Sequence, residues 1–442
     1  MKSLVVLYAL IYSAIVGALA NSFVLIKHFP SAPFILIALF VLLSVSAIFL
    51  TFKAKAIKIK FCLLGTVLLD SFCGSVVLSL VWQILVAIKY IPHDGMTFVW
   101  SLVVCIAVNA VVFWAGIICV YLTSTQLGIK LRVIGIICGM MPIANLVVLF
   151  FIIKTTTAEC LFETEKERVN EQRKDLKICA TKYPILLVHG VFFRDTKCFN
   201  YWGRIPKELE TNGASIFYGN HSSAASVADS AAELKERIDE ILAQTGADKV
   251  NIIAHSKGGL DCRYAIAKLG VSDRVASLTT VNTPHRGCLF ADHLLTKIPT
   301  DIKEKVARTY NSTLQKFGEA EADFLAAVSD LTESSCTRLN DELPAPEGIY
   351  CQSIGSVLTK ATGGKFPLNF SHPLVKHYSG ENDGLVSVDS FEWGEKFTLL
   401  KPDKKRGISH GDMIDLNREN IDGFDVREFY VNLVKELKNR GL

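Results

Sequence analysis

The sequence predicts two structural classes in one chain: an all-α membrane bundle, followed by an α/β domain with a mostly parallel sheet and helices on both faces. Two observations carry this prediction. The first 154 of the 442 residues consist largely of long apolar stretches. The remainder alternates short β-branched runs with amphipathic helical segments, which is the pattern of a covered parallel sheet.

The apolar stretches cover residues 4–26, 33–52, 62–88, 97–123 and 132–153. Each is long enough to cross a hydrocarbon core of about 30 Å as a helix. A cleaved signal peptide would account for the first stretch alone. We therefore expect residues 1–154 to form a transmembrane region of about five helices, and the protein to be an integral, multi-pass membrane protein.

Charge divides the chain at the same boundary. Residues 1–154 carry a net charge of +8 and the remainder a net charge of −4. Because the basic excess is confined to the apolar part, it gives no indication of nucleic-acid binding. Lysine and arginine are denser in the segments expected to lie on the same side as the amino terminus, which the positive-inside rule assigns to the cytoplasm. The second part is then expected to be extracytoplasmic.

Twelve cysteines are divided between the parts, five in the apolar stretches and seven beyond them. The first five are expected to be packing residues. The other seven form no CxxC pair, so the sequence predicts no zinc site, whereas an extracytoplasmic location would permit disulfides. Residues 155–183 are charged and mostly lack apolar periodicity, which indicates a linker or stalk leading to a folded domain over 184–442.

Strands and helices alternate within that domain. Strands are predicted at 184–188, 214–218, 250–254, 275–281, 349–354, 374–379 and 395–400. Helices are predicted near 201–212, over 229–243 and 259–269, and from Asp425, as its cap, to about 438. Residues 288–345 interrupt the alternation, and a segment of this length indicates either a lid over an apolar site or a structural insertion.

The most informative motif follows the strand at 250–254. Residues 251–259 read Asn-Ile-Ile-Ala-His-Ser-Lys-Gly-Gly, which places Ser256 at the tip of a sharp strand-to-helix turn. A serine flanked by small residues two positions before and after it forms the nucleophile elbow of serine hydrolases. Ala254 and Gly258 occupy those positions, with alanine in place of the usual glycine. The turn holds the hydroxyl where a base can reach it.

An activated serine needs a histidine base that a carboxylate orients. Three histidines follow Ser256 beyond the interruption: His372, His377 and His410. His410 lies after the last predicted strand and before the last helix, where this order of elements places the base. His377 is expected within a strand, as a sheet residue. We therefore predict His410 as the base.

The segment 380–386 offers the acid. Asp383 lies there in a turn expected after a strand. Glu381 is its competitor, and Asp389 is a further alternative. Parallel sheets of this type carry their active sites at the carboxyl ends of strands, where Ser256, His189 and Thr283 are expected to lie.

Backbone N–H groups should stabilise the developing oxyanion. One donor is Lys257, which follows the nucleophile, and the second is Val191, with Phe192 as the alternative. The side chain of Lys257 is not required for this role. Its charge is a candidate for tuning the site or binding an anionic headgroup, and the simpler expectation is a solvated side chain.

Further residues near the expected site are assigned supporting roles. Histidines beside an active site are more often hydrogen-bonding scaffolds than bases, so His189, His255 and His285 are expected to position their neighbours. Gly258 is expected to let strand and helix approach closely, and Gly190 is expected to lie beside the site, directly before the second oxyanion donor.

These blocks resemble the bacterial triacylglycerol lipases of the α/β-hydrolase fold. The similarity covers residues 182–293 and, more thinly, 378–416. The matching blocks lie at 183–190, 247–260, 283–287, 382–387 and 409–412. The resemblance implies an α/β-hydrolase catalytic domain with Ser256 as nucleophile, Asp383 as acid and His410 as base. It also implies Val191 and Lys257 as the oxyanion donors.

The same resemblance raises the question of a metal ion. Secreted enzymes of that family carry a structural calcium ion, held in part by an aspartate shortly after the catalytic histidine, and Asp412 matches this position. The second aspartate has no counterpart, because residues 354–380 contain no Asp or Glu. We therefore predict no metal site and no cofactor, with Asp412 as the one candidate ligand for calcium.

The sequence thus predicts a membrane-anchored serine esterase or lipase whose partners are the membrane and a lipid or ester substrate. Acyl transfer to another hydroxyl would use the same triad. A third alternative is a non-enzymatic membrane protein with an inactive hydrolase domain. Asp70 supports it, because an ionisable group within a span is often functional. A structural role for Asp70, paired with Asn109 or Ser71, is the simpler explanation.

Overall fold

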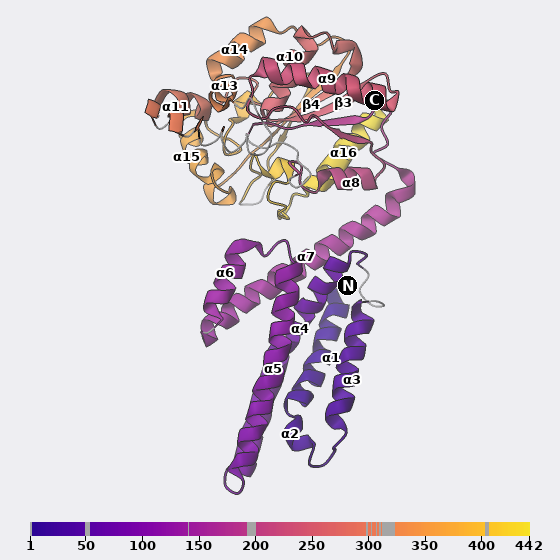
Figure 1. Ribbon diagram of the computed structural model, residues 1–442, viewed down its shortest axis with the longest axis vertical. Helices are drawn as coiled ribbons and strands as arrows, with labels where there is room; N and C mark the ends of the chain where they lie inside the picture. The colour runs from indigo at the N-terminus through magenta and orange to yellow at the C-terminus, as the bar shows by residue number, and fades with distance from the viewer. Residues whose placement is uncertain are drawn as a thin grey trace. The chain divides into compact units, whose positions relative to one another are not determined.

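The computed structural model describes residues 2–48, 54–139, 141–191, 200–297, 299–301, 303–305, 307–308, 311, 323–402 and 406–442. The chain divides into two compact units, Met1–Gln172 and Arg173–Leu442. The first unit is helical, and the second is built on a parallel sheet covered by helices (Figure 1).

The helical unit contains α1 (Lys2–Ala20), α2 (Ser22–Leu25), α3 (Ala32–Ser46), α4 (Ile57–Tyr90), α5 (Gly95–Thr123), α6 (Gly128–Cys138) and most of α7 (Pro142–Arg173). Within the described ranges, three helical stretches are long and apolar enough to cross a membrane, namely Ile57–Tyr90, Gly95–Thr123 and Ala144–Leu176. The helices Val5–Ala20 and Ala32–Ser46 are apolar but shorter.

The expectation of a single helix over 132–153 was wrong. The segment is divided between α6, which ends at Cys138, and α7, which begins at Pro142. Proline lacks the N–H that an uninterrupted helix would need and clashes with the preceding turn, but it fits the first position of a new helix.

The start of the expected linker belongs to the helical unit. Residues 155–172 continue α7 within this unit, and buried side chains of α7 pack with those of α4 and α5. The hydroxyls of Thr156 and Thr66 are 2.9 Å apart. Glu159 accepts the backbone N–H of Thr125 at 2.7 Å, and Glu167 accepts two backbone N–H groups just before α4 at 2.6 and 3.0 Å. The acidic side chains of α7 therefore accept hydrogen bonds from backbone N–H groups in the loops of the helical unit.

Helices α4 and α5 approach each other closely at two glycines. A Cβ atom at Gly65 would lie 2.6 Å from the Cβ of Cys119, and one at Gly116 would lie 2.8 Å from the side chain of Leu69. Small residues allow this kind of backbone approach between membrane helices.

The second unit contains a six-stranded sheet in the order β2-β1-β3-β4-β5-β6, and every pairing is parallel. Its strands are β1 (Ile185–Val188), β2 (Ile216–Tyr218), β3 (Val250–His255), β4 (Val275–Val281), β5 (Tyr350–Ser356) and β6 (Lys396–Leu400). The strands β1, β3 and β4 are buried along their whole length, as expected for strands covered on both faces. The predicted α/β fold is confirmed.

Helices cover both faces of the sheet (Figure 1). On one face, α9 (Val227–Thr245) and α10 (Lys257–Lys268) share an apolar core with Leu186 and Val188. On the other, α8 (Ile205–Thr211) and α16 (Val426–Asn439) share a core with Ile185 and Leu187. Alternate residues of β1 thus enter opposite cores, as the twofold period of a strand requires. Asp425 caps α16 as predicted.

The strand predicted at 374–379 is wrong, because these residues end α15 (Leu368–Ser379). The buried positions Leu368, Ser371, His372 and Val375 repeat with helical spacing, which becomes visible only when the residues before 374 are included. His377 is therefore an exposed helix residue rather than a sheet residue.

The interrupting segment 288–345 contains α11 (Leu289–Lys297), α13 (Phe324–Ser329) and α14 (Glu333–Glu342). Residues 298, 302, 306, 309–310 and 312–322 of this segment lie outside the described residues. Phe324 and Val328 pack with Val386 and Phe391 in one apolar cluster. The segment therefore contacts the loop that carries Asp383.

The close approach of α4 and α5 predicts that Gly116→Val destabilises the helical unit by about 1–3 kcal/mol, because the added atoms meet Leu69. Thermal unfolding of the full chain in detergent measures this. Gly95→Val is the matched control, since a Cβ at Gly95 meets nothing within 4 Å. Equal losses of stability in the two variants would contradict the prediction.

Candidate active site

Ser256 occupies the turn between β3 and α10 with φ 55° and ψ −132°. A non-glycine residue at positive φ is strained, and such strain is kept where the surrounding structure enforces it. The backbone N–H of Ser256 donates to the carbonyl of Val281 at 2.9 Å, which ties the turn to the end of β4. The side chain of Ser256 is half-buried at the carboxyl edge of the sheet.

Two glycines give this turn the space it needs. A Cβ atom at Gly258 would lie 2.4 Å from the carbonyl oxygen of His189, and one at Gly190 would lie 2.7 Å from the Cβ of Ser256. Any larger residue would push the end of β1 away from α10. Ala254, by contrast, is fully buried within β3, where its methyl group is accommodated.

His410 and Asp383 form a buried pair. The Nδ1 of His410 lies 2.6 Å from Oδ2 of Asp383, whose side chain is fully buried. Oδ1 accepts the backbone N–H groups of Leu385 and Val386, both at 2.9 Å, and Oδ2 also accepts Nδ2 of Asn282 at 2.5 Å. With Nδ1–H donated to the carboxylate, Nε2 of His410 carries the lone pair that can accept a proton.

The alternative residues lie elsewhere. Glu381 and Asp389 are exposed, and Glu381 forms a surface ion pair at 2.6 Å. His372 is buried with Nε2 2.8 Å from a backbone carbonyl oxygen, and His377 is exposed on α15. Of the acids and bases weighed from the sequence, Asp383 and His410 are the two that the structure brings together.

His255 connects the serine turn to the His410 loop. Its Nδ1 lies 2.7 Å from the hydroxyl of Tyr201 and its Nε2 lies 3.2 Å from the carbonyl oxygen of His410. Burial lowers the pKa of His255 well below its usual value, so the ring is neutral. We assign the tautomer in which Tyr201 donates to Nδ1 and Nε2–H donates to His410. The rings of His255 and His410 lie 4.5 Å apart.

Sequence reasoning missed Tyr201 and Asn282. Tyr201 accepts the backbone N–H of Gly190 at 3.0 Å and so joins the loop after β1 to His255. Asn282, at φ 49°, holds Asp383 and also donates to Ser356 at 2.7 Å. The only signal for Asn282 was its position directly after β4, at the same edge of the sheet as the serine.

The expectation of a solvated Lys257 side chain was wrong. Its Nζ is buried, 2.7 Å from Oδ1 of Asp261 and 2.9 Å from the hydroxyl of Ser230. The i,i+4 spacing of lysine and aspartate on α10 was the available signal. Oδ2 of Asp261 lies 3.5 Å from Nε2 of His221, which stacks on His189. Burial raises the pKa of Asp261 to about 6, although Lys257 opposes the shift.

The expected oxyanion donors lie beside the serine turn. Lys257 is the first residue of α10, where helical N–H groups have no intrahelical partner. Val191 follows Gly190 and is buried. Among the residues that the structure describes, none accepts a hydrogen bond from the backbone N–H of either residue. The alternative donor, Phe192, lies outside the described residues.

His285, expected to position its neighbours, is held by three side-chain contacts. Its Nδ1 lies 3.1 Å from Nη1 of Arg263, its Nε2 lies 2.9 Å from the hydroxyl of Thr280, and its ring stacks on Trp393. Burial, reinforced by the charge of Arg263, lowers the pKa of His285 well below its usual value. The ring is therefore neutral and held at the end of β4.

The calcium ion implied by the resemblance does not fit Asp412. Oδ2 of Asp412 accepts Nη1 of Arg406 at 2.7 Å and the backbone N–H of Ser409 at 2.8 Å. A calcium ion would have to displace this guanidinium. No group of three or more potential ligands occurs among the described residues.

The described cysteines are all free thiols, and Cys198 lies outside the described ranges.

The chain is similar to known proteins over part of its length. Residues 183–365 match the family model described as the alpha/beta hydrolase fold. A triacylglycerol lipase of Pseudarthrobacter phenanthrenivorans is 34% identical over 178 residues, which are 38% of this chain and 55% of that protein. A triacylglycerol lipase of Vibrio cholerae is 29% identical over 288 residues, covering 59% of this chain and 89% of that protein.

The coverage of these relatives is uneven. The chain spans 55% of the Pseudarthrobacter protein and 49% of a triacylglycerol lipase of Burkholderia plantarii, about half the length of each. The crystal structure of the Staphylococcus hyicus lipase is 17% identical, covers 59% of this chain and 97% of that one, and gives a TM-score of 0.47. The matched part of this chain is similar to lipase-like carboxylic ester hydrolases.

Because His255 and His285 are buried and neutral, we predict that the free energy of unfolding of the second unit falls on acidification. A histidine with a depressed folded-state pKa binds its proton only in the unfolded chain. Its stabilisation is thus present above about pH 6.5 and lost below it, by about 1.4 kcal/mol per pH unit. His285→Gln should reduce the loss between pH 6.5 and 5.5 by about 1 kcal/mol, less than the limiting slope because the unfolded histidine is already half protonated at pH 6.5. Pulse proteolysis of the full chain in urea measures this, with the exposed His377→Gln as control. An unchanged pH dependence in His285→Gln would contradict the assignment.

Proposed function

Residues 183–365 belong to the α/β-hydrolase family, and we propose that the whole chain is a membrane-anchored serine esterase or lipase. The observation that carries the proposal is the Asp383–His410 pair, 2.6 Å apart, at the same edge of the sheet as the strained turn of Ser256. A buried aspartate behind a histidine, beside a serine at a strand-to-helix turn, is the arrangement that acyl transfer to serine requires.

In the proposed reaction, Oγ of Ser256 attacks the carbonyl carbon of an ester while Nε2 of His410 takes the hydroxyl proton. Asp383 keeps the imidazole in the required tautomer and stabilises its positive charge. The backbone N–H groups of Lys257 and Val191 stabilise the oxyanion. When the tetrahedral intermediate collapses, His410 returns the proton to the departing alcohol. Water, activated by His410 in turn, then releases the acid from the acyl-enzyme.

A lipid-like substrate is supported by three features. The relatives named above are triacylglycerol lipases. The segment 288–345 packs apolar side chains, including Phe324 and Val328, against the loop that carries Asp383, where they would cover an acyl chain as a lid. The chain also contains helices long and apolar enough to span a bilayer. We place the hydrolase domain outside the cytoplasm, on the distribution of basic residues.

The proposal predicts that Ser256→Ala and His410→Gln lower kcat for ester hydrolysis by at least about 10³-fold. Asp383→Asn should lower it about as much, because the imidazole loses its tautomeric partner. Glu381→Gln, two residues away and exposed, should retain activity within about twofold. The assay uses the full chain in detergent and p-nitrophenyl esters of increasing acyl length.

The outcomes separate the candidate functions. Activity that requires Ser256 and rises with acyl length indicates a lipase, and activity confined to short esters indicates an esterase. Esters of an added alcohol, formed in preference to free acid, would indicate an acyltransferase. Full activity in Ser256→Ala, or equal losses in Glu381→Gln and Asp383→Asn, would refute the proposed triad.

A further inference from the structure

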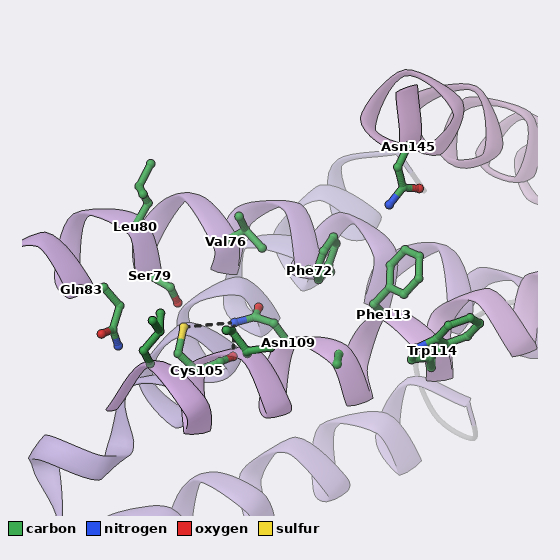
Figure 2. A pocket seen from close by; sticks show the side chains of 13 residues that line it. Phe72, Val76, Ser79, Leu80, Gln83, Cys105, Asn109, Phe113, Trp114 and Asn145 are labelled. Carbon is green, nitrogen blue, oxygen red and sulfur yellow. Dashed lines mark hydrogen bonds between the residues drawn. The ribbon is translucent and has the colours of Figure 1, made fainter. Parts of the chain in front are cut away.

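Two of the pockets that the described residues form differ in the charge of their walls. The pocket between α4 and α5 in the helical unit is lined by apolar and uncharged polar side chains, among them Phe72 and Asn145 (Figure 2). The other pocket, of about 350 Å³, lies in the second unit, between α10, the loop after β4, the end of α14 and the residues before β6. We call it the arginine pocket, because Arg263 and Arg286 line it. Its volume is usual for a small-molecule site.

Arg263 brings a buried positive charge to the arginine pocket. The residue is 5% exposed, and burial lowers its pKa to about 10, so it remains charged at pH 7. Its Nη1 donates to Nδ1 of His285 at 3.1 Å, and its Nη2 donates to Oδ1 of Asn340 at 2.9 Å. Both acceptors are neutral, and no carboxylate of the described residues pairs with this guanidinium. The charge is therefore held in place but not neutralised.

The guanidinium of Arg263 also keeps hydrogen-bond donors for a ligand. A guanidinium has five N–H groups, and the two bonds to His285 and Asn340 leave three of them. Its Nε has no partner in the described part of the chain and is not one of the side-chain atoms sealed from solvent. Its Cζ lies over the ring of Trp393, 5.0 Å from the ring centroid, which further fixes the group.

Two exposed residues complete the charge of the arginine pocket. Nη1 of Arg286 donates to the backbone carbonyl of Asp389 at 2.6 Å, and this guanidinium too has no carboxylate partner among the described residues. Glu392 lines the pocket without forming an ion pair to either arginine. Because His285 is neutral, the described lining carries two positive charges and one negative charge. A ligand with a single negative charge balances this set.

We propose that the arginine pocket binds the carboxylate of a small organic acid. The carboxylate oxygens accept N–H groups of Arg263 and Arg286, since a planar guanidinium matches the two oxygens of a carboxylate. The carbon skeleton packs against apolar lining residues, which are Leu343, Pro344, Ala345 and the ring of Trp393.

Two other ligand classes fit this wall less well. A doubly charged phosphate carries more negative charge than the lining offsets, and a neutral amide leaves the charge of Arg263 uncompensated. The residues of the proposed triad, Ser256, Asp383 and His410, do not line the arginine pocket. Acid binding there is therefore independent of the proposed ester hydrolysis.

Fluorinated probes test the proposal on the full chain in an uncharged detergent at pH 7. The probe is para-fluorobenzoate, and its control is para-fluorobenzamide, which has nearly the same shape without the charge. Broadening of the fluorine NMR resonance during titration gives the two dissociation constants. We expect the acid to bind at least about tenfold more tightly than the amide, and its affinity to fall as sodium chloride is added. Inorganic phosphate should compete with the acid more weakly than unlabelled benzoate does.

Substitutions of the two exposed lining residues locate the probe without disturbing the buried Arg263. Arg286→Gln removes a positive charge and should weaken binding of the acid by about three- to tenfold. Glu392→Gln removes the negative charge and should strengthen binding by about two- to fivefold, a gain that a damaged protein would not show. Arg338→Gln, at an exposed arginine of α14 outside the pocket lining, is the matched control and should bind the acid as the wild type does.

Four results would overturn the proposal: equal affinity for acid and amide, tighter binding of phosphate than of the acid, unchanged binding in Arg286→Gln or Glu392→Gln, or loss of binding in His410→Gln. The last result would place the acid at the candidate active site instead. A chain that binds the acid but hydrolyses no ester would leave this inference standing and remove the proposed catalytic function, so the two claims fail separately.

Discussion

The fully buried carboxylate of Asp383 imposes the constraint on which the arrangement of the second unit depends. A negative charge without water must be compensated by donors at hydrogen-bond distance, and the four donors here come from three different parts of the chain. Two are backbone N–H groups of its own turn, the third is Asn282 after β4, and the fourth is His410 after β6. The end of β4, the end of β6 and the turn of Asp383 must therefore keep fixed positions relative to one another.

A second set of contacts links this acid–base pair to the serine turn. The backbone N–H of Gly190 donates to Tyr201, Tyr201 contacts His255, and His255 contacts the carbonyl of His410. Burial keeps His255 neutral, so it can accept at one nitrogen and donate at the other. The positive φ of Ser256 and the close approach at Gly258 place the turn against the end of β1. The loops after β1, β3, β4 and β6 are thus joined by short polar contacts rather than by apolar packing alone.

Much of the sheet and the turn of Ser256 could be predicted from the sequence. Parallel strands that are buried on both faces are recognised as continuous apolar runs. The strands around Leu187, Ile253 and Leu278 were found in this way, and the small residues around Ser256 gave the turn. Prediction from local sequence patterns failed where the structure of a segment depends on residues outside that segment. The segment 374–379 looked like a strand because its helix begins at Leu368, outside the segment considered.

Partners distant in sequence were also beyond prediction. Asn282 is one of many polar residues after a strand, and only the fold brings it to Asp383, 101 positions away. Lys257 appeared solvated because its partner Ser230 is recognised only once α9 packs on α10, and because its i,i+4 spacing from Asp261 was not considered.

The central claim is that Ser256 is an activated nucleophile, and reaction of the full chain with a fluorophosphonate tests it most directly. Serine attack at phosphorus expels fluoride and leaves a stable adduct, which peptide mapping by mass spectrometry can locate. We predict one adduct, on Ser256, formed at least about 10³-fold more slowly in His410→Gln. An adduct on another serine, or a rate at Ser256 that does not depend on His410, would contradict the account.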